Sequence, residues 1–268
     1  MPLPLYTATR YLQPLREGGS LPAVVETDAG GLFVVKFRGA GQGARALVAE
    51  LLVGLLARRL GLAAPELALV EVAEAFGRGE RDPEIQDLLA ASQGVNVGLR
   101  YLDGAFNFEA SAAGDLVSPE FAARVVWLDA FTTNPDRTHR NPNLLVWRRR
   151  PWLIDHGAAL YAHHDWASVD EARMRTSFPL IRDHVLLARA GDLLEADREL
   201  SALLEGDAIA AIVADLPDAL LTEPAAERAR YVEYLTARLR GPRAFAAEAV
   251  AAQERLRAEP PRRLQARR

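Results

Sequence analysis

The hydrophobic positions in the first hundred residues predict several short strands and one long buried helix. Residues 23–27 and 32–37 are apolar runs typical of strands, and Asp28-Ala29-Gly30-Gly31 between them has the residues of a tight hairpin turn. In residues 43–60 the leucines recur at i, i+4 spacing, which indicates a helix that ends at Gly61. The first part of the chain is therefore expected to combine strands with a helix.

The pattern becomes mainly helical further along the chain. Strands are still expected at residues 67–72 and 95–102, and Asp82-Pro83 predicts the start of a short helix between them. Ser118-Pro119-Glu120 is typical of a helix start, and a short hairpin is expected at residues 143–154. Beyond the hairpin, helices are predicted at residues 178–190, 192–204, 207–215 and 224–252.

These elements predict an α+β fold in two parts. Residues 1–102 are expected to form a small N-terminal α/β lobe, and residues 103–268 a larger, mainly helical C-terminal lobe. The tail from Gln253 contains six arginines and Pro260-Pro261, so it is expected to be frayed or disordered.

The composition excludes several classes of protein. Half of the residues are hydrophobic and a quarter are charged, which is typical of a globular chain and excludes disorder for most of it. No apolar run approaches the roughly 18 residues of a membrane span, and the first residues lack the pattern of a signal peptide, so we expect a cytoplasmic protein. The absence of cysteine excludes disulfides and thiolate catalysis, and the net charge of −4 argues against a dedicated nucleic-acid binder.

A polar segment after the helix from Ser118 carries the strongest chemical signal. Asp136 and Asn141 lie on a loop in the order Asp-x₄-Asn, and the following hairpin delivers Asp155 at a strand end. Phosphoryl transfer from a nucleotide needs one carboxylate near the accepting hydroxyl, and amide and carboxylate oxygens that share hard divalent cations. Turn chemistry explains Asn-Pro-Asp alone, but the second aspartate favours a phosphotransferase site.

Lys36 and Glu50 are a second pair of candidates. Lys36 is the only lysine among 32 basic residues, which suggests a site where a compact ammonium does what a guanidinium cannot. Glu50 is the only polar side chain in the apolar stretch 46–57, so it is expected to be buried and to need a partner. We therefore predict an ion pair between Glu50 and Lys36 that holds the ammonium over nucleotide phosphates.

Three further sets of residues are weaker candidates. The backbone of Gly18-Gly19-Ser20 could approach phosphate oxygens, and the segment Arg100-Tyr101-Leu102, between the two parts of the chain, is placed to act as an adenine-binding hinge. His139 either braces the catalytic loop or contacts phosphate. No zinc-binding histidine spacing occurs, so zinc is not expected.

The sequence resembles the HipA-like kinases. The resemblance rests on residues 134–141 (Asn-Pro-Asp-Arg-Thr-His-Arg-Asn), on Ile154-Asp155-His156-Gly157 and on Val34-Val35-Lys36-Phe37, and it covers most of the chain. These are bacterial proteins with a protein-kinase-like two-lobed fold, of which the best-known members are serine/threonine kinases that act as toxins. The chain differs from the full-length toxins in its shorter length and in a phosphate loop without their Gln-containing pattern.

The resemblance implies roles for the candidate residues. Asp136 would orient or deprotonate the accepting hydroxyl, and Asn141 and Asp155 would bind Mg²⁺. Lys36 would bind the phosphates of ATP. By the same resemblance the cofactors are ATP and Mg²⁺, the substrate is a protein of unknown identity, and a separately encoded antitoxin is a candidate partner. Residues 18–20 would form the phosphate loop and residues 100–102 the adenine hinge.

Three alternatives remain open from the sequence. A small-molecule kinase of the aminoglycoside or choline type would use an acidic pocket, for which Asp165, Asp170 and Glu171 are candidates. A pseudokinase or interaction module would bind a nucleotide or partner without turnover. A helical scaffold would place Lys36 far from Asp155.

Overall fold

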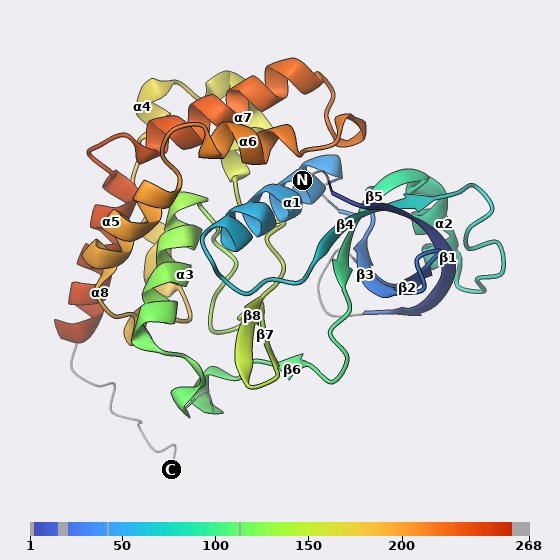
Figure 1. Cartoon of the computed structure of the whole chain (residues 1–268), viewed down its shortest axis with the longest axis horizontal. Coiled ribbons are helices and arrows are strands. Elements are labelled where there is room, and N and C mark those ends of the chain that lie inside the picture. The colour runs from blue at the N-terminus through green and yellow to red at the C-terminus, as the bar shows by residue number, and fades with distance from the viewer. Residues whose placement is uncertain (1–2, 16–20, 42, 113, 259–268) are drawn as a thin grey trace, which may run out of the picture.

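The N-terminal part of the chain is a closed β-barrel. The computed structural model describes residues 3–15, 21–41, 43–112 and 114–258. The barrel strands follow one another in the order β1 (Leu5–Pro14), β2 (Ala23–Thr27), β3 (Leu32–Lys36), β5 (Gly94–Arg100) and β4 (Leu67–Val72), as Figure 1 shows. Neighbouring strands are antiparallel except for β1 and β4, whose parallel pairing closes the barrel.

Four of the barrel strands lie where the sequence predicts them, whereas β1 was not predicted. Its residues are mostly exposed or half-buried, and only Ala8 is buried. A strand with one buried side chain shows no alternation of apolar and polar positions, so the hydrophobic pattern cannot reveal it. The barrel interior is filled by apolar side chains from the strands and from α2 (Pro83–Ala91).

Helix α1 (Ala44–Arg59) lies between the barrel and the C-terminal helices (Figure 1). It is buried on nearly every side, which explains its uniformly apolar sequence. Its side chains belong to the same hydrophobic cluster as those of α3 (Pro119–Phe131), not to the cluster inside the barrel. The helix therefore ties the barrel to the helical part.

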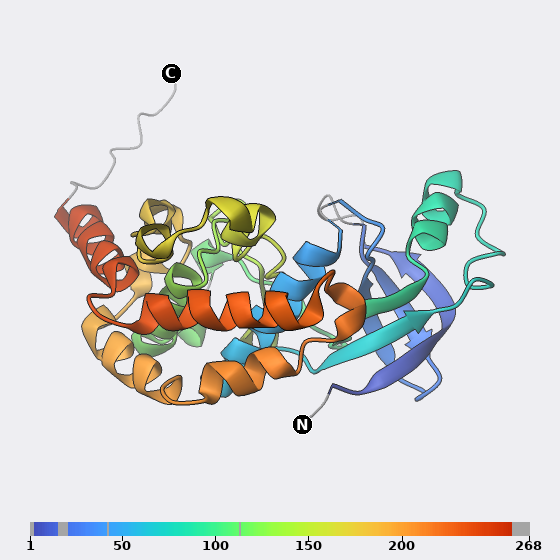
Figure 2. The ribbon, with the colours of Figure 1, turned by 90° about the horizontal axis from the view of Figure 1, so that it is seen from above.

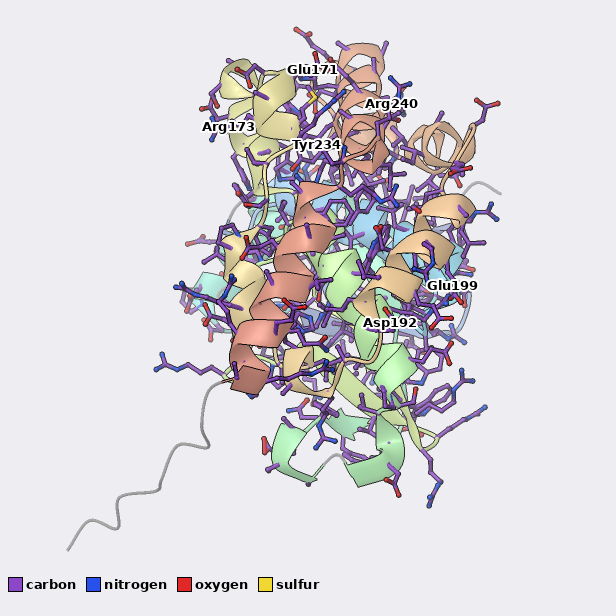
Figure 3. All side chains as sticks on the ribbon, turned by 90° about the vertical axis from the view of Figure 1, so that its left-hand side faces the viewer. Glu171, Arg173, Asp192, Glu199, Tyr234 and Arg240 are labelled. Atoms are coloured by element: carbon purple, nitrogen blue, oxygen red, sulfur yellow. The ribbon has the colours of Figure 1, made fainter. Side chains whose placement is uncertain are left out.

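The C-terminal part packs its helices around α3. Side-chain oxygens cap the starts of its two inner helices. That of Ser118 accepts from the amide of Phe121 at the start of α3, and that of Asp192 accepts from two amides at the start of α5 (Leu193–Leu203; Figure 3). Figure 2 shows how the outer helices cover this part. They are α4 (Glu171–Met174), α6 (Ala208–Ala214), α7 (Pro224–Leu239) and α8 (Ala244–Ala258).

Between the two parts lies a small sheet in which β7 (Leu144–Trp147) and β8 (Arg150–Leu153) form the predicted hairpin. The short strand β6 (Phe106–Asn107) pairs with β7. Short 3₁₀ helices fill the connections: η1 (Ala110–Ala112), η2 (Gly114–Leu116), η3 (Tyr161–Ser168), η4 (Pro179–Asp183), η5 (Leu187–Arg189) and η6 (Asp218–Leu220).

Two predicted helices were wrong. Residues 178–190 form two separate 3₁₀ turns, η4 and η5, because the backbone between them pairs with the loop after α3: the amide of Val185 donates to the carbonyl of Arg137. The helix predicted at residues 224–252 is two helices, since Pro242, which lacks a backbone N–H, follows Gly241 in the connection.

The predicted end of ordered structure at Gln253 was also too early. Helix α8 continues to Ala258, and the side-chain amide of Gln253 is buried and donates to the carbonyl of Ala190 at 2.5 Å. The rest of the predicted tail, residues 259–268, lies outside the described residues. Within the described residues, every helix is too short or too polar to cross a lipid bilayer.

Candidate active site

A cavity of about 520 Å³ lies between the barrel and the β7–β8 hairpin. Val34 and Lys36 line it from β3, and Arg100, Tyr101 and Leu102 line it from the chain that leaves β5. Asp155, which follows β8, lines it from the opposite side. Most of the lining is apolar, with a few charged groups, which is the usual composition of a small-molecule site.

Lys36 joins two carboxylates at the inner end of this cavity. Its ammonium lies 2.7 Å from Oε2 of Glu50 on α1 and 2.6 Å from Oδ1 of Asp155. The predicted ion pair between Lys36 and Glu50 is therefore confirmed, and Asp155 is a second partner. Three segments far apart in the sequence thus meet at one ammonium group.

The buried carboxylate of Glu50 has a second role. Its Oε2 also accepts a hydrogen bond from the backbone amide of His156 at 2.7 Å, and its side chain is fully buried. Its Oε1 is buried and has no hydrogen-bond partner among the described residues. Helix α1 is thus tied both to the lysine strand and to the backbone that follows Asp155.

The charges of this group shift one another's pKa in the expected directions. Burial alone would lower the pKa of Lys36, but the carboxylates of Glu50 and Asp155 outweigh it and the pKa is raised above its usual value. Burial alone would raise the pKa of Asp155, but the ammonium of Lys36 outweighs it and the pKa is lowered. Lys36 is therefore a cation and Asp155 an anion at neutral pH.

Asp136 lies on the loop after α3 and is held by two asparagine side chains. Its Oδ2 accepts from Nδ2 of Asn141 at 2.8 Å and from Nδ2 of Asn143 at 3.1 Å. The same Nδ2 of Asn143 lies 3.5 Å from the carbonyl oxygen of Asp155. Asn143 therefore connects the two loops that carry the aspartates.

Beneath these loops lies a buried charge network that sequence reasoning missed. Asp129 on α3 accepts from Nε of Arg137 at 2.6 Å, from Nε2 of His184 at 2.9 Å and from Nδ2 of Asn134 at 3.0 Å. Burial opposes ionisation of Asp129, but Arg137 and His184 outweigh it and lower its pKa well below the usual range. Asp129 lies in an apolar helix, as Glu50 does. It could therefore have been predicted by the same rule, that a lone buried carboxylate needs a partner.

The hydrogen bonds assign the tautomers of two buried histidines. Nδ1 of His184 accepts from the amide of Leu186, so its Nε2 carries the proton given to Asp129. Nδ1 of His156 faces Nη2 of Arg137 at 3.2 Å, and a guanidinium can only donate, so the proton of His156 is on Nε2. Burial lowers the pKa of His156 to about 4, which keeps it neutral.

Backbone strain is concentrated around the same loops. Thr133, Asn143 and Asp155 have φ values of 53°, 49° and 57°. For residues other than glycine, such values cost energy and persist only where the surrounding structure enforces them. The loops that carry Asp136 and Asp155 are thus held in fixed, unfavourable conformations.

The remaining predicted residues lie in different places. Arg100, Tyr101 and Leu102 line the cavity with Lys36 and Asp155. His139 is exposed on the loop of Asp136. Gly18, Gly19 and Ser20 lie outside the described residues, so their predicted role as a phosphate loop stays a prediction.

The donor set around Asp155 and Asn141 fits a hard divalent cation. Carboxylate and amide oxygens are the ligands that Mg²⁺ takes in proteins, usually one or two from the protein with phosphate and water for the rest. Because Nδ2 of Asn141 donates to Asp136, its Oδ1 is the atom left for a cation. No cluster of three or more His, Asp or Glu side chains suited to a metal occurs in the described part of the chain.

Comparison with known proteins identifies a family and several solved structures to which this chain is similar. The model of a family described as "HipA-like kinase" matches residues 9–177. No protein among the curated sequences matches. A crystal structure of CtkA, described as a proinflammatory kinase of Helicobacter pylori, is similar with a TM-score of 0.60 and 12% identity, over 97% of this chain and 100% of that chain.

A Golgi casein kinase crystallised with Mn and ADP is similar with a TM-score of 0.40 and 13% identity, over 93% of this chain and 75% of that chain. The similarity to CtkA shows that this chain shares the mixed helix and strand fold of that protein.

Proposed function

The chain belongs to the HipA-like kinase family, and we propose that it is an ATP- and Mg²⁺-dependent kinase that transfers phosphate to serine or threonine of a protein. The observation that carries this proposal is the meeting of Lys36 and Asp155, 2.6 Å apart, at the inner end of a cavity lined by residues 100–102. The cavity then combines three groups that ATP needs. Lys36 is a cation for the phosphates, Asp155 is a carboxylate for a metal, and the largely apolar lining suits the adenine base.

Each residue has a distinct part in the proposed reaction. Residues 100–102 bind the base, and Lys36 binds phosphate oxygens while Glu50 holds its ammonium in place. Asp155 and Asn141 hold Mg²⁺, which neutralises charge on the phosphates when bound. Asp136, fixed by Asn141 and Asn143, orients the accepting hydroxyl and takes its proton.

A protein substrate is favoured over a small molecule by the state of the acidic residues. Asp170 caps α4 by accepting from the amide of Arg173, and Glu171 pairs with Arg175 at 2.8 Å. Figure 3 shows Glu171 and Arg173 on the outside of the molecule. Asp165 is also exposed. These carboxylates form a solvated surface, not the acidic pocket that an aminoglycoside-type kinase would need.

The test is transfer of labelled phosphate from ATP in the presence of Mg²⁺, to the protein itself and to proteins of a cell lysate. We expect transfer by the wild type and a loss of about 10²–10³-fold in Asp136→Ala and in Asp155→Asn, because each removes a group that acts at the transferred phosphate. Asp207→Asn, an exposed aspartate at the start of α6, is the matched control and should be fully active.

Two results would contradict the proposal. Nucleotide binding by calorimetry without any transfer would indicate a pseudokinase. No binding of ATP or ADP, with or without Mg²⁺, would exclude both activities.

A further inference from the structure

Arg137 follows Asp136 in the sequence but points away from the cavity, into the protein. Its side chain is fully buried, and its hydrogen bonds are made to groups of the protein. Nε donates to Asp129, Nη1 donates to the carbonyls of Asn143 and Ile154, and Nη2 donates to His156. Because its side chain is fully buried and does not line the cavity, Arg137 directs no donor at a bound nucleotide, and we assign it no direct role in phosphate binding.

The two carbonyls held by Nη1 mark the two ends of the β7–β8 hairpin. Asn143 immediately precedes β7, and Ile154 immediately follows β8. The two residues also pair with each other, since the amide of Ile154 donates to the carbonyl of Asn143 at 3.1 Å. The Nη1 group of Arg137 thus binds both ends of the hairpin, at the residues next to the site.

The residues at this point are the ones that carry the site. Asn143 has a strained φ of 49° and its side chain binds Asp136. Asp155, with a strained φ of 57°, comes directly after Ile154. The carbonyl positions of Asn143 and Ile154 fix the backbone from which the Asn143 amide and the Asp155 carboxylate project.

We propose that Arg137 is a positioning residue that sets the placement of Asp136 relative to Asp155 by clamping both ends of the hairpin. This inference rests on the proposed kinase activity. The clamp needs the planar guanidinium, because donors in three directions must reach a carboxylate, two carbonyls and an imidazole at once. The ammonium of a lysine carries the same charge but lacks the planar arrangement of donors in fixed directions.

Arg243 provides a control for loss of a half-buried arginine contact away from the site. It lies in the connection between α7 and α8, forms a bidentate pair at 2.7–2.9 Å with Asp197 on α5, and contacts none of the site residues. Arg243→Lys should lower the melting temperature without changing the reaction. Any effect of Arg137→Lys beyond that of Arg243→Lys is then an effect on the site.

The experiment measures kcat, KM for ATP and the melting temperature of Arg137→Lys and Arg243→Lys. We expect kcat of Arg137→Lys to fall about 10²-fold, the effect of a small misplacement of catalytic groups. Its KM for ATP should stay within about threefold, because the cavity and Lys36 are unchanged. A kcat that falls no more than in Arg243→Lys overturns the proposal.

A second measurement keeps the test independent of turnover and of folding. The crystal structure of Arg137→Lys should show the hydrogen bonds from Asn141 and Asn143 to Asp136 broken or lengthened, and both bonds intact would overturn the clamp even if the wild type transfers no phosphate. If Arg137→Lys does not fold, Asn143→Gly tests the hydrogen bond from the Asn143 side chain to Asp136, through which the clamp acts on Asp136. Glycine accepts the positive φ and keeps the backbone carbonyl that Arg137 binds, so only the side-chain amide is lost. Its kcat should fall at a nearly unchanged KM, and an unchanged kcat overturns the proposal.

An inactive wild type is a different result. It contradicts the proposed function, while the crystal structure alone then decides whether Arg137 places the two aspartates.

Discussion

Two neighbouring charge networks differ in their access to solvent. Lys36, Glu50 and Asp155 meet at the cavity, and the side chain of Asp155 is 40% exposed. Asp129 and Arg137 lie beneath the loops, and both side chains are 0% exposed. The open network joins the barrel strand β3, helix α1 and the end of the hairpin, whereas the sealed one joins α3, the loop after it and the two ends of the hairpin.

The difference teaches what each network can do. Asp155 can exchange its contact with Lys36 for a cation or for water, because it borders the cavity. Asp129 cannot exchange partners without leaving an unpaired charge in the protein interior, which is strongly unfavourable. The exposed network can therefore change its partners, whereas the buried network beneath it keeps the loops in place.

The largest expected effect on stability comes from the sealed network. Asp129→Asn leaves the guanidinium of Arg137 buried without a carboxylate, so the free energy of unfolding should fall by about 3–5 kcal/mol. Asp155→Asn, with a half-exposed side chain, should lower it by about 1 kcal/mol or less while removing activity. Urea denaturation of both variants, with phosphate transfer measured in parallel, checks the contrast. Equal losses of stability would show that the two networks do not differ in the way we describe.

A smaller effect is expected from pH, through His163. This side chain is fully buried and its Nδ1 lies 2.9 Å from the hydroxyl of Tyr231. Burial, aided by His164 and Arg45, lowers its pKa to about 3. Below about pH 6.5 the unfolded chain takes up a proton that the folded chain does not, so the free energy of unfolding falls by up to about 1.4 kcal/mol per pH unit.

The expected stability is therefore complete above about pH 6.5 and lost progressively towards the folded pKa of about 3. Urea denaturation at several pH values should show a shallower slope in His163→Asn than in the wild type. His164→Asn is the control, because this neighbour is exposed and should change the slope less. A slope unchanged by His163→Asn would contradict the assignment.

The smallest effect is expected at an exposed ion pair. Glu171 and Arg175 lie 2.8 Å apart, with side chains 77% and 38% exposed. Glu171→Gln should change the free energy of unfolding by about 0.5 kcal/mol or less, because water screens the pair. Phosphate transfer should be unchanged, and a marked loss of transfer would revive an acidic acceptor site at this helix.

The sequence predicts the elements whose pattern depends only on local burial. Helix α1 and strand β4 lie at the expected residues because each shows a regular apolar pattern. The 3₁₀ turns between residues 178 and 190 were mistaken for a helix because their apolar spacing is helical. Their conformation depends on pairing with the distant loop of Arg137, which no local pattern records.

The candidate site was predicted in part for similar reasons. The pair between Lys36 and Glu50 followed from the rule that a lone buried charge needs a partner. The role of Arg137 was not predicted, since a polar segment gives no sign of which of its side chains turn inward. Asp129 was overlooked, although the rule that found Glu50 also applies to a lone carboxylate in the apolar helix α3. The two strained residues at the hairpin ends could not be foreseen either, because their conformation is enforced by tertiary contacts.

The single lysine has a consequence for the chemistry of the whole chain. Any acylating reagent or enzyme that acts on side-chain amines has one target, Lys36, and that target faces the cavity. Acylation would abolish the positive charge that Glu50 and Asp155 share. Acylation located on Lys36 by peptide mapping would therefore report on the cavity, and occupancy of the cavity would appear as protection of this one side chain.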